Sequence, residues 1–569
     1  MYARSEQLLV HHGTDGDLLS SGPLLSFCLF IAVSSLKAVL ANSMCDLSAT
    51  DLLIVVNLSE AFIFTFMLFA VVITVGGIIP FLVLYLAQAL FFVINICYVN
   101  TLMTPLHLGS CYRLWWETLT IIDKMSLHLS FKAFLLAIMD LPLLLFFLKR
   151  YGPVRKMFTA RSNVVGSASV TALLCLSGLV AVTELTAIPK INYFYQSRET
   201  ESALIHRYGL LAYHIFENIS WEDEQKELLH LDYGPETALP DKKMPPAGII
   251  LIQVESLDAA IIDFTWKNRY VTPFLHELSR QSIYYPYTLS YHKAGGSSDC
   301  EVSVLNSFEP LENFPTIKSS TYTYPNSVVR GLRRNGFAAT AFHGNTGDFY
   351  NRDYAYFEMD FDNFYDRKRM GLPDEGWGAS DEKVMAFTRA KLGRSNKPFF
   401  SYVITMSSHE PFRNVENYYQ SNQFAEVTPV LARNYLTSMA YLDRVLQTFV
   451  RQIQKDHPGT YIFIFGDHTP YAVKTGPFHR TSIFTENKNF EFVPLLIVTP
   501  DKLVHYETTN AASFLDIAPT VLAAAGVPSR IRTYGENLLS SSLHNPVPFS
   551  GTNYRRDMLY RKAKGISGE

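Results

Sequence analysis

Long, almost uninterrupted apolar runs occupy the first third of the chain. A helix needs roughly 20 mostly apolar residues to cross a bilayer, and five runs approach this length, at 24–42, 55–75, 78–98, 131–148 and 164–184. Gly76 and Gly77, with Pro80 after them, separate the second run from the third as in a tight helical hairpin, and Asp140 and Pro142 interrupt the fourth. The pattern predicts an α-helical transmembrane domain of five spans over residues 1–188.

Ionisable residues also occur in this apolar part of the chain, at Lys37, Glu60, Lys132 and Asp140. Such residues can mark a transport path through a membrane. We interpret them instead as groups near the ends of their spans, whose charged tips reach the headgroup region.

The loop at 149–163 indicates the orientation of the spans. It contains five Lys and Arg residues, the densest short basic loop of this half of the chain, and such loops stay in the cytoplasm. Five spans then place the N-terminus inside and everything after about residue 185 outside.

Residues 189–245 read as a juxtamembrane linker. The stretch from Glu201 to Ile219 is amphipathic and predicts a helix between the membrane and the next domain. Prolines and charged residues at 239–246 form a turn-rich end to the linker.

From residue 246 to 569, short apolar runs alternate with helical patterns. The runs read as buried parallel strands, and they lie at 248–254, 338–342, 399–405, 460–465 and 492–498. Helical patterns lie between them at 326–335, 380–392 and 428–454. This alternation predicts a doubly wound α/β domain, in which ligands bind beyond the carboxyl ends of the strands.

Charge and cysteine content narrow the range of functions. The formal net charge of −3 argues against nucleic acid as a partner, because phosphate backbones require clustered Lys and Arg. Cys300 is the single cysteine after the membrane half, so the α/β domain cannot contain an internal disulfide. Cys45 and Cys111 fall in predicted outer loops, where a bridge and two free thiols are both open.

Three residues with metal-binding side chains follow two of the predicted strands. Glu255 follows 248–254, while Asp467 and His468 follow 460–465. Singly, such residues are usually solvated or cap helices. Together, at the edge where ligands are expected, two carboxylates and an imidazole can hold a divalent cation with an open position.

The segment from Lys293 to Glu301 joins two glycines to hydroxyl and acidic residues. It reads as a helix N-terminus, which favours a bound anion, and a serine there that contacts a cation becomes a nucleophile. The alternative is an ordinary cap, in which Ser297 or Ser298 caps the helix and Glu301 closes a capping box.

Several motifs together carry a family resemblance. They are VES at 254–256, GGSSDCE at 295–301, FHGNTGDFYNRD at 342–353, SSHEPF at 407–412, GDH at 466–468, VPLLIV at 493–498 and LDIAPTVLAAAG at 515–526. In this order they resemble the lipoteichoic acid synthases, which are phosphoglycerol transferases of the alkaline phosphatase and sulfatase superfamily. The resemblance covers nearly the whole chain and implies a sulfatase-like fold for the C-terminal α/β domain.

The resemblance also implies roles for individual residues. Glu255, Ser297, Asp467 and His468 match the family's metal ligands, with manganese the implied ion and magnesium or zinc as alternatives. Ser297 matches the nucleophile, although Ser298 adjoins it, and His409 is a candidate to assist proton transfer. The implied substrate-binding residues are His343, Tyr350, Arg352, His409 and His479. The family usually has threonine in place of Ser297 and tryptophan in place of Tyr350.

The implied enzyme is a phosphotransferase of the bacterial cytoplasmic membrane with an extracytoplasmic catalytic domain. It would move glycerophosphate from phosphatidylglycerol to a hydroxyl acceptor on an envelope glycan or polymer through a phospho-serine intermediate. Alternatives are a phosphoethanolamine transferase, a sulfatase-like hydrolase, and a non-enzymatic membrane sensor or transporter with an inactive domain. The sulfatase alternative is weak, because Ser-Asp-Cys-Glu follows Ser297 where a sulfatase has Pro and Arg. For Arg352 the alternative to phosphate binding is a surface pair with Asp353.

Overall fold

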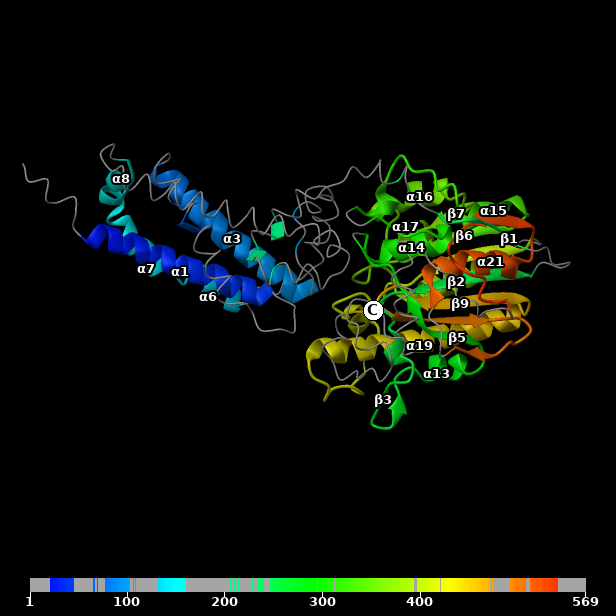
Figure 1. Ribbon diagram of the computed structural model, residues 1–569. Helices are drawn as coiled ribbons and strands as arrows, with labels where there is room; N and C mark the ends of the chain where they lie inside the picture. Colours follow the sequence, from blue (N-terminus) through cyan, green and yellow to red (C-terminus); the bar gives the residue numbers. More distant parts are fainter. Residues whose placement is uncertain are drawn as a thin grey trace, which may run out of the picture. The chain divides into compact units, whose positions relative to one another are not determined.

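The computed structural model describes most of the chain between residues 21 and 540 (Figure 1). The described ranges are 21–45, 77–102, 131–159, 233–239, 246–311, 314–392, 397–470, 492–507 and 512–540, except 294 and 420, together with scattered positions at 65–69, 106–108, 205–231 and 473. These residues belong to two compact units, one made of residues 1–108 and 127–219, the other of 109–126 and 220–569.

The N-terminal unit is helical. Its described helices are α1 (Ser21–Cys45), α3 (Ile78–Leu102), α6 (Phe131–Ile138), α7 (Leu141–Leu148) and α8 (Tyr151–Thr159). Three segments in the described ranges are long and apolar enough to cross a membrane, and they are Leu25–Cys45, Ile78–Val99 and Phe131–Leu148. They correspond to the first, third and fourth predicted spans. The second and fifth spans, at 55–75 and 164–184, lie outside the continuous described ranges, as do Cys111 and Glu60.

The fourth span is broken where its sequence predicts. Helix α6 ends at Ile138, Met139 and Asp140 form a turn, and α7 begins at Leu141. Pro142 stands in the first turn of α7, where a proline is tolerated because the first N–H groups of a helix have no intrahelical partner. The break frees the Asp140 side chain to turn toward α1 and α3.

A buried ion pair lies at this break. Lys37 Nζ of α1 is 2.7 Å from Asp140 Oδ2, and neither side chain is exposed. Ser34 Oγ donates to Asp140 Oδ2, and the Tyr85 hydroxyl donates to Asp140 Oδ1, each over 2.7 Å. Interpreting Lys37 and Asp140 as residues whose charged tips reach the headgroups was therefore wrong: they neutralise one another inside the bundle. Lys132, in contrast, is exposed at the start of α6.

Part of the predicted linker helix belongs to the N-terminal unit. The described positions at 205, 209–210 and 213–214 are helical, and Ile205, Leu210 and Tyr213 pack with apolar residues of α1, α3 and α6. The Leu210 N–H donates to Asn42 Oδ1 over 3.0 Å, and His214 Nε2 lies 3.0 Å from Asn95 Oδ1. These three described apolar side chains are therefore covered by helices of their own unit.

The second unit is built on one large sheet. In the described residues its strand order is β11-β5-β10-β9-β2-β8-β6-β7, and β12 also pairs with β5. The central strands are parallel neighbours. They are β2 (Gly248–Val254), β6 (Ala338–His343), β7 (Asn363–Tyr365), β8 (Phe399–Ile404) and β9 (Thr460–Gly466).

One predicted strand runs in the other direction. Strand β10 (Phe492–Val498) pairs antiparallel with β9 and with β5 (Ile283–Leu289), so the prediction that it is parallel was wrong. A strand buried on both faces has a continuous apolar sequence in either direction, so its composition does not reveal the direction. Strands β5, β11 (His505–Tyr506) and β12 (Ala512–Ser513) were not predicted.

Helices cover both faces of the sheet. Ile249 and Leu251 of β2 pack in one apolar core, whereas Ile250 and Ile252 pack in another, because successive side chains of a strand point to opposite faces. The first core contains residues of α14 (Ser297–Asn306), α15 (Val328–Arg334), α16 (Arg352–Glu358) and α21 (Ile517–Ala525). The second contains residues of α13 (Pro273–Ser279), α18 (Asp381–Lys391) and α19 (Val430–Asp456).

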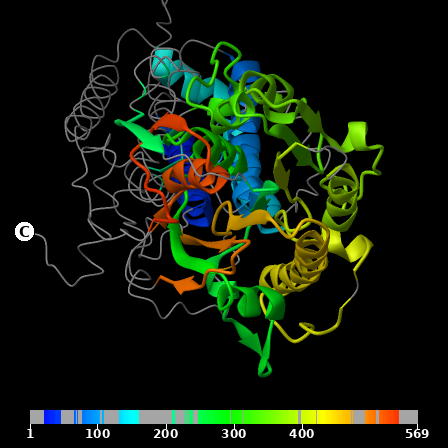
Figure 2. The ribbon, with the colours of Figure 1, turned by 90° about the vertical axis from the view of Figure 1, so that its right-hand side faces the viewer.

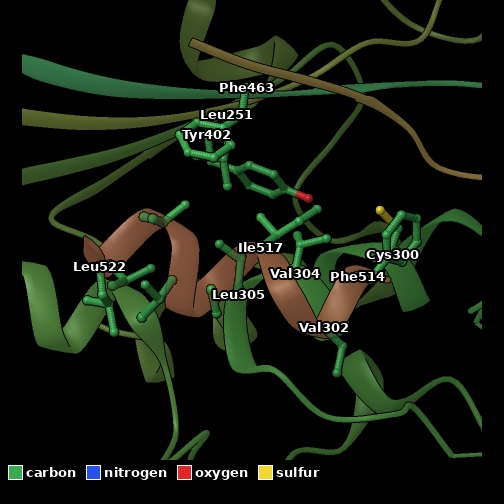
Figure 3. Packing of buried hydrophobic residues seen from close by; sticks show 14 of the residues in the cluster. Leu251, Cys300, Val302, Val304, Leu305, Tyr402, Phe463, Phe514, Ile517 and Leu522 are labelled. Atoms are coloured by element: carbon green, nitrogen blue, oxygen red, sulfur yellow. The ribbon is translucent and has the colours of Figure 1, made fainter. Parts of the chain in front are cut away.

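The figures show both layers. In Figure 2 the yellow-orange α19 and the red α21 lie on opposite sides of the strands. Figure 3 shows Leu251, Tyr402 and Phe463 of the sheet above Val304 and Ile517 of the first core. The doubly wound α/β fold is thus confirmed in its layers.

Small elements complete the second unit. Two short strand pairs are β1 (Glu236–Leu239) with β13 (Ser529–Arg532) and β3 (Thr265–Trp266) with β4 (Arg269–Tyr270). The others are the helix α17 (Arg367–Met370) and the 3₁₀ turns η3 (Ala259–Ile261), η4 (Thr316–Lys318), η5 (Phe349–Asn351), η6 (Asn414–Asn417) and η7 (Phe514–Asp516).

The buried ion pair of the membrane unit predicts a specific pattern of stability. Lys37→Met leaves the Asp140 carboxylate buried without its cation, which costs about 3–5 kcal/mol, and should lower the Tm of the full-length protein in detergent. Adding Asp140→Asn removes the uncompensated charge. Its amide oxygen can accept from one of the hydroxyls of Ser34 and Tyr85 and its NH₂ group can donate to the other, so the double variant should regain most of the loss. Lys132→Met is the matched control and should leave Tm unchanged. Equal Tm values for wild type and Lys37→Met would contradict the assignment.

Candidate active site

The register of two neighbouring strands brings three metal-binding side chains together. Val254 of β2 lies opposite Gly466 of β9 in a parallel ladder, so Glu255 directly follows one strand where Asp467 and His468 follow the other. One ligand atom from each of these residues lies within 4.8 Å of the others, and all three side chains are buried. His468 Nδ1 lies 2.9 Å from Asp467 Oδ1, and its Nε2 lies 3.8 Å from Glu255 Oε1.

This cluster fits a divalent cation. Asp467 Oδ2 is buried and has no hydrogen-bond partner among the described residues, and a buried carboxylate oxygen without a partner is costly. Burial, with the neighbouring Asp467, raises the pKa of Glu255 to about 8. Two buried carboxylates in contact repel one another, and a bound cation would offset that repulsion. The donor set of two carboxylates and one imidazole suits manganese, magnesium or zinc.

Ser297 lies beside this cluster and Ser298 does not. Ser297 is the first residue of α14, is half-buried, and its Oγ donates to Glu255 Oε2 over 3.0 Å. Ser298 is fully buried, and its hydroxyl donates to the Gly295 carbonyl over 2.7 Å. Ser256 also contacts the cluster, because its Oγ donates to Glu255 Oε1 over 3.0 Å.

The loop before α14 is held by an aspartate rather than by a serine cap. Asp299 Oδ2 accepts the backbone N–H groups of Lys293 and Gly295 over 2.8 and 2.9 Å. A Cβ at Gly295 would lie 2.2 Å from Asp299 Oδ1, and Gly296 has a φ of +56°, so both glycines are required by this close turn. The turn presents the Ser297 hydroxyl at the helix N-terminus.

Arg352 is buried, and its partner is Glu301. Arg352 Nη2 lies 2.6 Å from Glu301 Oε1, and Arg352 Nε lies 3.1 Å from both carboxylate oxygens. The Tyr356 hydroxyl also donates to Glu301 Oε2. Asp353 pairs instead with Arg369, so the alternative of a surface pair between Arg352 and Asp353 was wrong. The capping box with Glu301 was also wrong, since that side chain contacts α16.

His343 and His409 lie near Arg352. Burial, followed by the positive charge of Arg352 and the proximity of His409, lowers the pKa of His343 well below its usual value, so His343 is neutral at neutral pH. His409 lies in the loop after β8, where its ring stacks on Trp377 at 4.3 Å and an angle of 24°. Its Nδ1 lies 2.8 Å from the Glu410 carbonyl oxygen. Its Nε2 is on the other side of the ring and does not take part in this contact.

Tyr350 lies close to Arg352, in a loop of unusual backbone geometry. The Arg352 guanidinium carbon is 5.6 Å from the centre of the Tyr350 ring. Tyr350 and Asn351 have φ values of 58° and 54°, a region that non-glycine residues rarely adopt. His479 lies outside the described residues.

Four residues near the site were not predicted from the sequence. Glu301 has the i+4 spacing from Ser297 that places two side chains on one helix face, which is a readable signal. The ring of His292 lies 4.4 Å from that of His468, and His292 precedes the Gly-Gly pair by only three residues. Asp381 accepts the N–H groups of Met406 and Ser407 over 2.7 and 3.1 Å, which holds the loop that leads to His409. Nothing in the local sequence indicates that Asp381 or Trp377 lies near this loop.

Comparisons with known proteins agree with this fold. The sulfatase family matches residues 248–527. The lipoteichoic acid synthase-like protein YvgJ of Bacillus subtilis is 24% identical over 454 residues, which cover 74% of this chain and 72% of that protein. Lipoteichoic acid synthase 2 of the same organism is 27% identical, over 57% of this chain and 51% of its own length.

A solved structure shares the fold over both units. The integral membrane protein lipooligosaccharide phosphoethanolamine transferase A of Neisseria meningitidis is 13% identical, covers 89% of this chain and 96% of that chain, and has a TM-score of 0.55. Residues 248–527 therefore match the sulfatase family, three N-terminal segments are long and apolar enough to cross a membrane, and the chain is similar to the lipoteichoic acid synthases.

Proposed function

We propose that the protein is a membrane phosphotransferase that moves glycerophosphate from phosphatidylglycerol to an acceptor hydroxyl through a phospho-serine intermediate. The observation that carries the proposal is the position of Ser297. Its hydroxyl is at the N-terminus of α14, 3.0 Å from a carboxylate of the metal-binding cluster. A helix N-terminus favours an anion such as a phosphodiester. The relatives named lipoteichoic acid synthases support the same reaction class.

In the first half-reaction, Ser297 Oγ attacks the phosphorus of the donor lipid. A bond forms between Oγ and phosphorus, and the bond between phosphorus and the diacylglycerol oxygen breaks. The proton that Ser297 loses ends on the diacylglycerol oxygen, with His409 as the candidate carrier. A divalent cation held by Glu255, Asp467, His468 and Ser297 would favour the serine alkoxide and neutralise phosphate charge.

In the second half-reaction, an acceptor hydroxyl attacks the same phosphorus. The bond between Ser297 Oγ and phosphorus breaks, and the acceptor's proton ends on Ser297. Arg352 donates to the phosphate oxygens in both steps, since phosphoryl transfer depends mainly on positioning and electrostatics. Excluding water from the phospho-serine would favour transfer over hydrolysis. The expected acceptor is a hydroxyl of an envelope glycan or polymer.

The charges on the loop of Tyr350 favour a glycerol head group over ethanolamine. A cationic ethanolamine requires a free carboxylate, and the loop of Tyr350 offers Asp348 and Asp353. Asp353 pairs with Arg369, and Lys368 Nζ lies 3.8 Å from the exposed Asp348. A neutral glycerol requires hydrogen bonds instead, and the neutral His343 can supply one. The same argument weighs against phosphoethanolamine transfer.

The proposed orientation follows from the basic loop at 149–163. With five spans, the catalytic unit lies outside the bacterial cytoplasmic membrane, where phosphatidylglycerol of the outer leaflet and envelope acceptors meet. Spans two and five are part of this proposal.

Donor choice is tested by turnover of two lipids. Purified full-length protein, loaded with manganese, should release diacylglycerol from phosphatidylglycerol at least tenfold faster than from phosphatidylethanolamine in otherwise identical vesicles. The reason is that both carboxylates of the Tyr350 loop, Asp348 and Asp353, pair with cations. Faster release from phosphatidylethanolamine would refute the phosphoglycerol assignment and leave the serine mechanism standing.

The metal site is tested by measuring the metal content of purified variants. Asp467→Asn removes one charge from the cluster and should lower both bound metal, measured by elemental analysis of the purified protein, and turnover. Asp443→Asn is the matched control, because Asp443 is another buried aspartate, which accepts the N–H groups of Phe274 and Leu275 instead. It should keep its metal even if its Tm falls. Full metal occupancy in Asp467→Asn would show that the cation binds elsewhere.

A further inference from the structure

One buried carboxylate near the site takes no part in the metal cluster. Glu301 has no exposed surface, and both of its oxygens accept hydrogen bonds from α16. Arg352, which begins α16, donates to it through Nε and Nη2, and Tyr356 donates through its hydroxyl. A single carboxylate on α14 therefore fixes two side chains of another helix.

The contacts of Arg352 leave part of its guanidinium group available. A guanidinium has five N–H donors. Those of Arg352 that are engaged are the Nε–H, one on Nη2 toward Glu301, and one on Nη1 toward the Phe349 carbonyl oxygen at 3.2 Å. One N–H on each terminal nitrogen has no acceptor among the described residues. Two such N–H groups in one plane form the fork that suits two oxygens of a phosphate.

Arg352 keeps its positive charge in this buried position. Burial lowers the pKa of Arg352, but the Glu301 carboxylate outweighs this effect and the pKa is raised overall. The Arg352 side chain is only 4% exposed, so its neighbours restrict rotation of the guanidinium. While Glu301 binds Nε and Nη2, the two free N–H groups keep their direction. The carboxylate thus determines which edge of the guanidinium is free.

Glu301 is also linked to the nucleophile. It follows Ser297 by four residues on α14, which places both side chains on the same helix face, one turn apart. Successive turns of one helix therefore carry the serine proposed as nucleophile and the carboxylate that contacts the arginine. A movement of α14 moves both together.

We propose that Glu301 is a positioning residue that holds Arg352 in the orientation in which its free N–H groups bind the phosphate at Ser297. The proposal rests on the proposed function, because it assigns the phosphate at Ser297 to the transferred group. Glu301 acts through Arg352 and does not itself touch the substrate. Its negative charge weakens the attraction of Arg352 for phosphate, so its contribution must be alignment rather than charge.

The substitution Glu301→Gln separates alignment from charge. Glutamine keeps one acceptor oxygen and replaces the other by an NH₂ group. At the position of Oε2, that NH₂ group would face the Arg352 Nε–H and the Tyr356 hydroxyl, which both donate there, so the guanidinium is no longer held from both oxygens and can turn. If alignment dominates, phosphate binding weakens. If charge dominates, removing the carboxylate strengthens it.

The experiment is a double-mutant cycle on the full-length, metal-loaded protein, with the affinity for inorganic phosphate measured by calorimetry. Glu301→Gln and Arg352→Lys should each raise Kd about tenfold, equivalent to about 1.4 kcal/mol. Because both changes remove the same contact, the double variant should bind no more weakly than Arg352→Lys alone. Unchanged or tighter binding in Glu301→Gln, or full additivity in the double variant, overturns the proposal.

Controls separate positioning from folding and from the proposed function. Glu507→Gln makes the same change at a buried glutamate directly after the edge strand β11 and should leave Kd unchanged. Tyr356→Phe removes one hydrogen bond to Glu301 and keeps all charges, so we expect a smaller rise in Kd. This rise should be absent when Arg352 is already Lys, and the comparison remains available if Glu301→Gln fails to fold.

The affinity for inorganic phosphate does not depend on the donor lipid. A cycle that behaves as expected without any lipid turnover would reject the proposed function alone.

Discussion

Val254 at the end of β2 lies opposite Gly466 at the end of β9, and this one register brings Glu255, Asp467 and His468 together. This pairing of β2 with β9 requires a glycine at position 466, since a Cβ there would lie 1.9 Å from the Leu257 carbonyl oxygen. A slip of one residue would turn the metal-binding side chains to opposite faces of the sheet. The helix that presents Ser297 then needs only to meet this cluster, and its contact with Glu255 shows that it does.

Buried charge is compensated in different ways in the two units. In the membrane unit, Lys37 and Asp140 neutralise one another, and two hydroxyls satisfy the carboxylate. In the catalytic unit, Glu301 and Arg352 form a complete pair with a third partner in Tyr356. The cluster of Glu255 and Asp467 differs from both, because within the described residues no Lys or Arg pairs with its two carboxylates, and their neighbours are the imidazole of His468 and neutral donors such as the Ser256 and Ser297 hydroxyls. This imbalance is the physical reason to expect a cation there and not at the other two sites.

The sequence was sufficient for the features that depend on local pattern. Apolar runs located the strands that carry Glu255, Asp467 and His343, and the Gly-Gly pair located the helix of Ser297. Features that depend on distant contacts were missed or misread. Lys37 and Asp140 are about a hundred residues apart, so each seemed to be a lone charge in an apolar run. The direction of β10, the partner of Arg352 and the stacking of His409 on Trp377 are set by tertiary packing, for which a single sequence gives no period or spacing.

The central claim is that Ser297 becomes covalently linked to the transferred group. The full-length protein is incubated with phosphatidylglycerol in the absence of acceptor, quenched in acid, digested and analysed by mass spectrometry. The account predicts a glycerophosphate adduct on Ser297, formed together with free diacylglycerol and absent from Ser297→Ala. An adduct on Ser298, or acceptor-dependent turnover by Ser297→Ala at the wild-type rate, would contradict it.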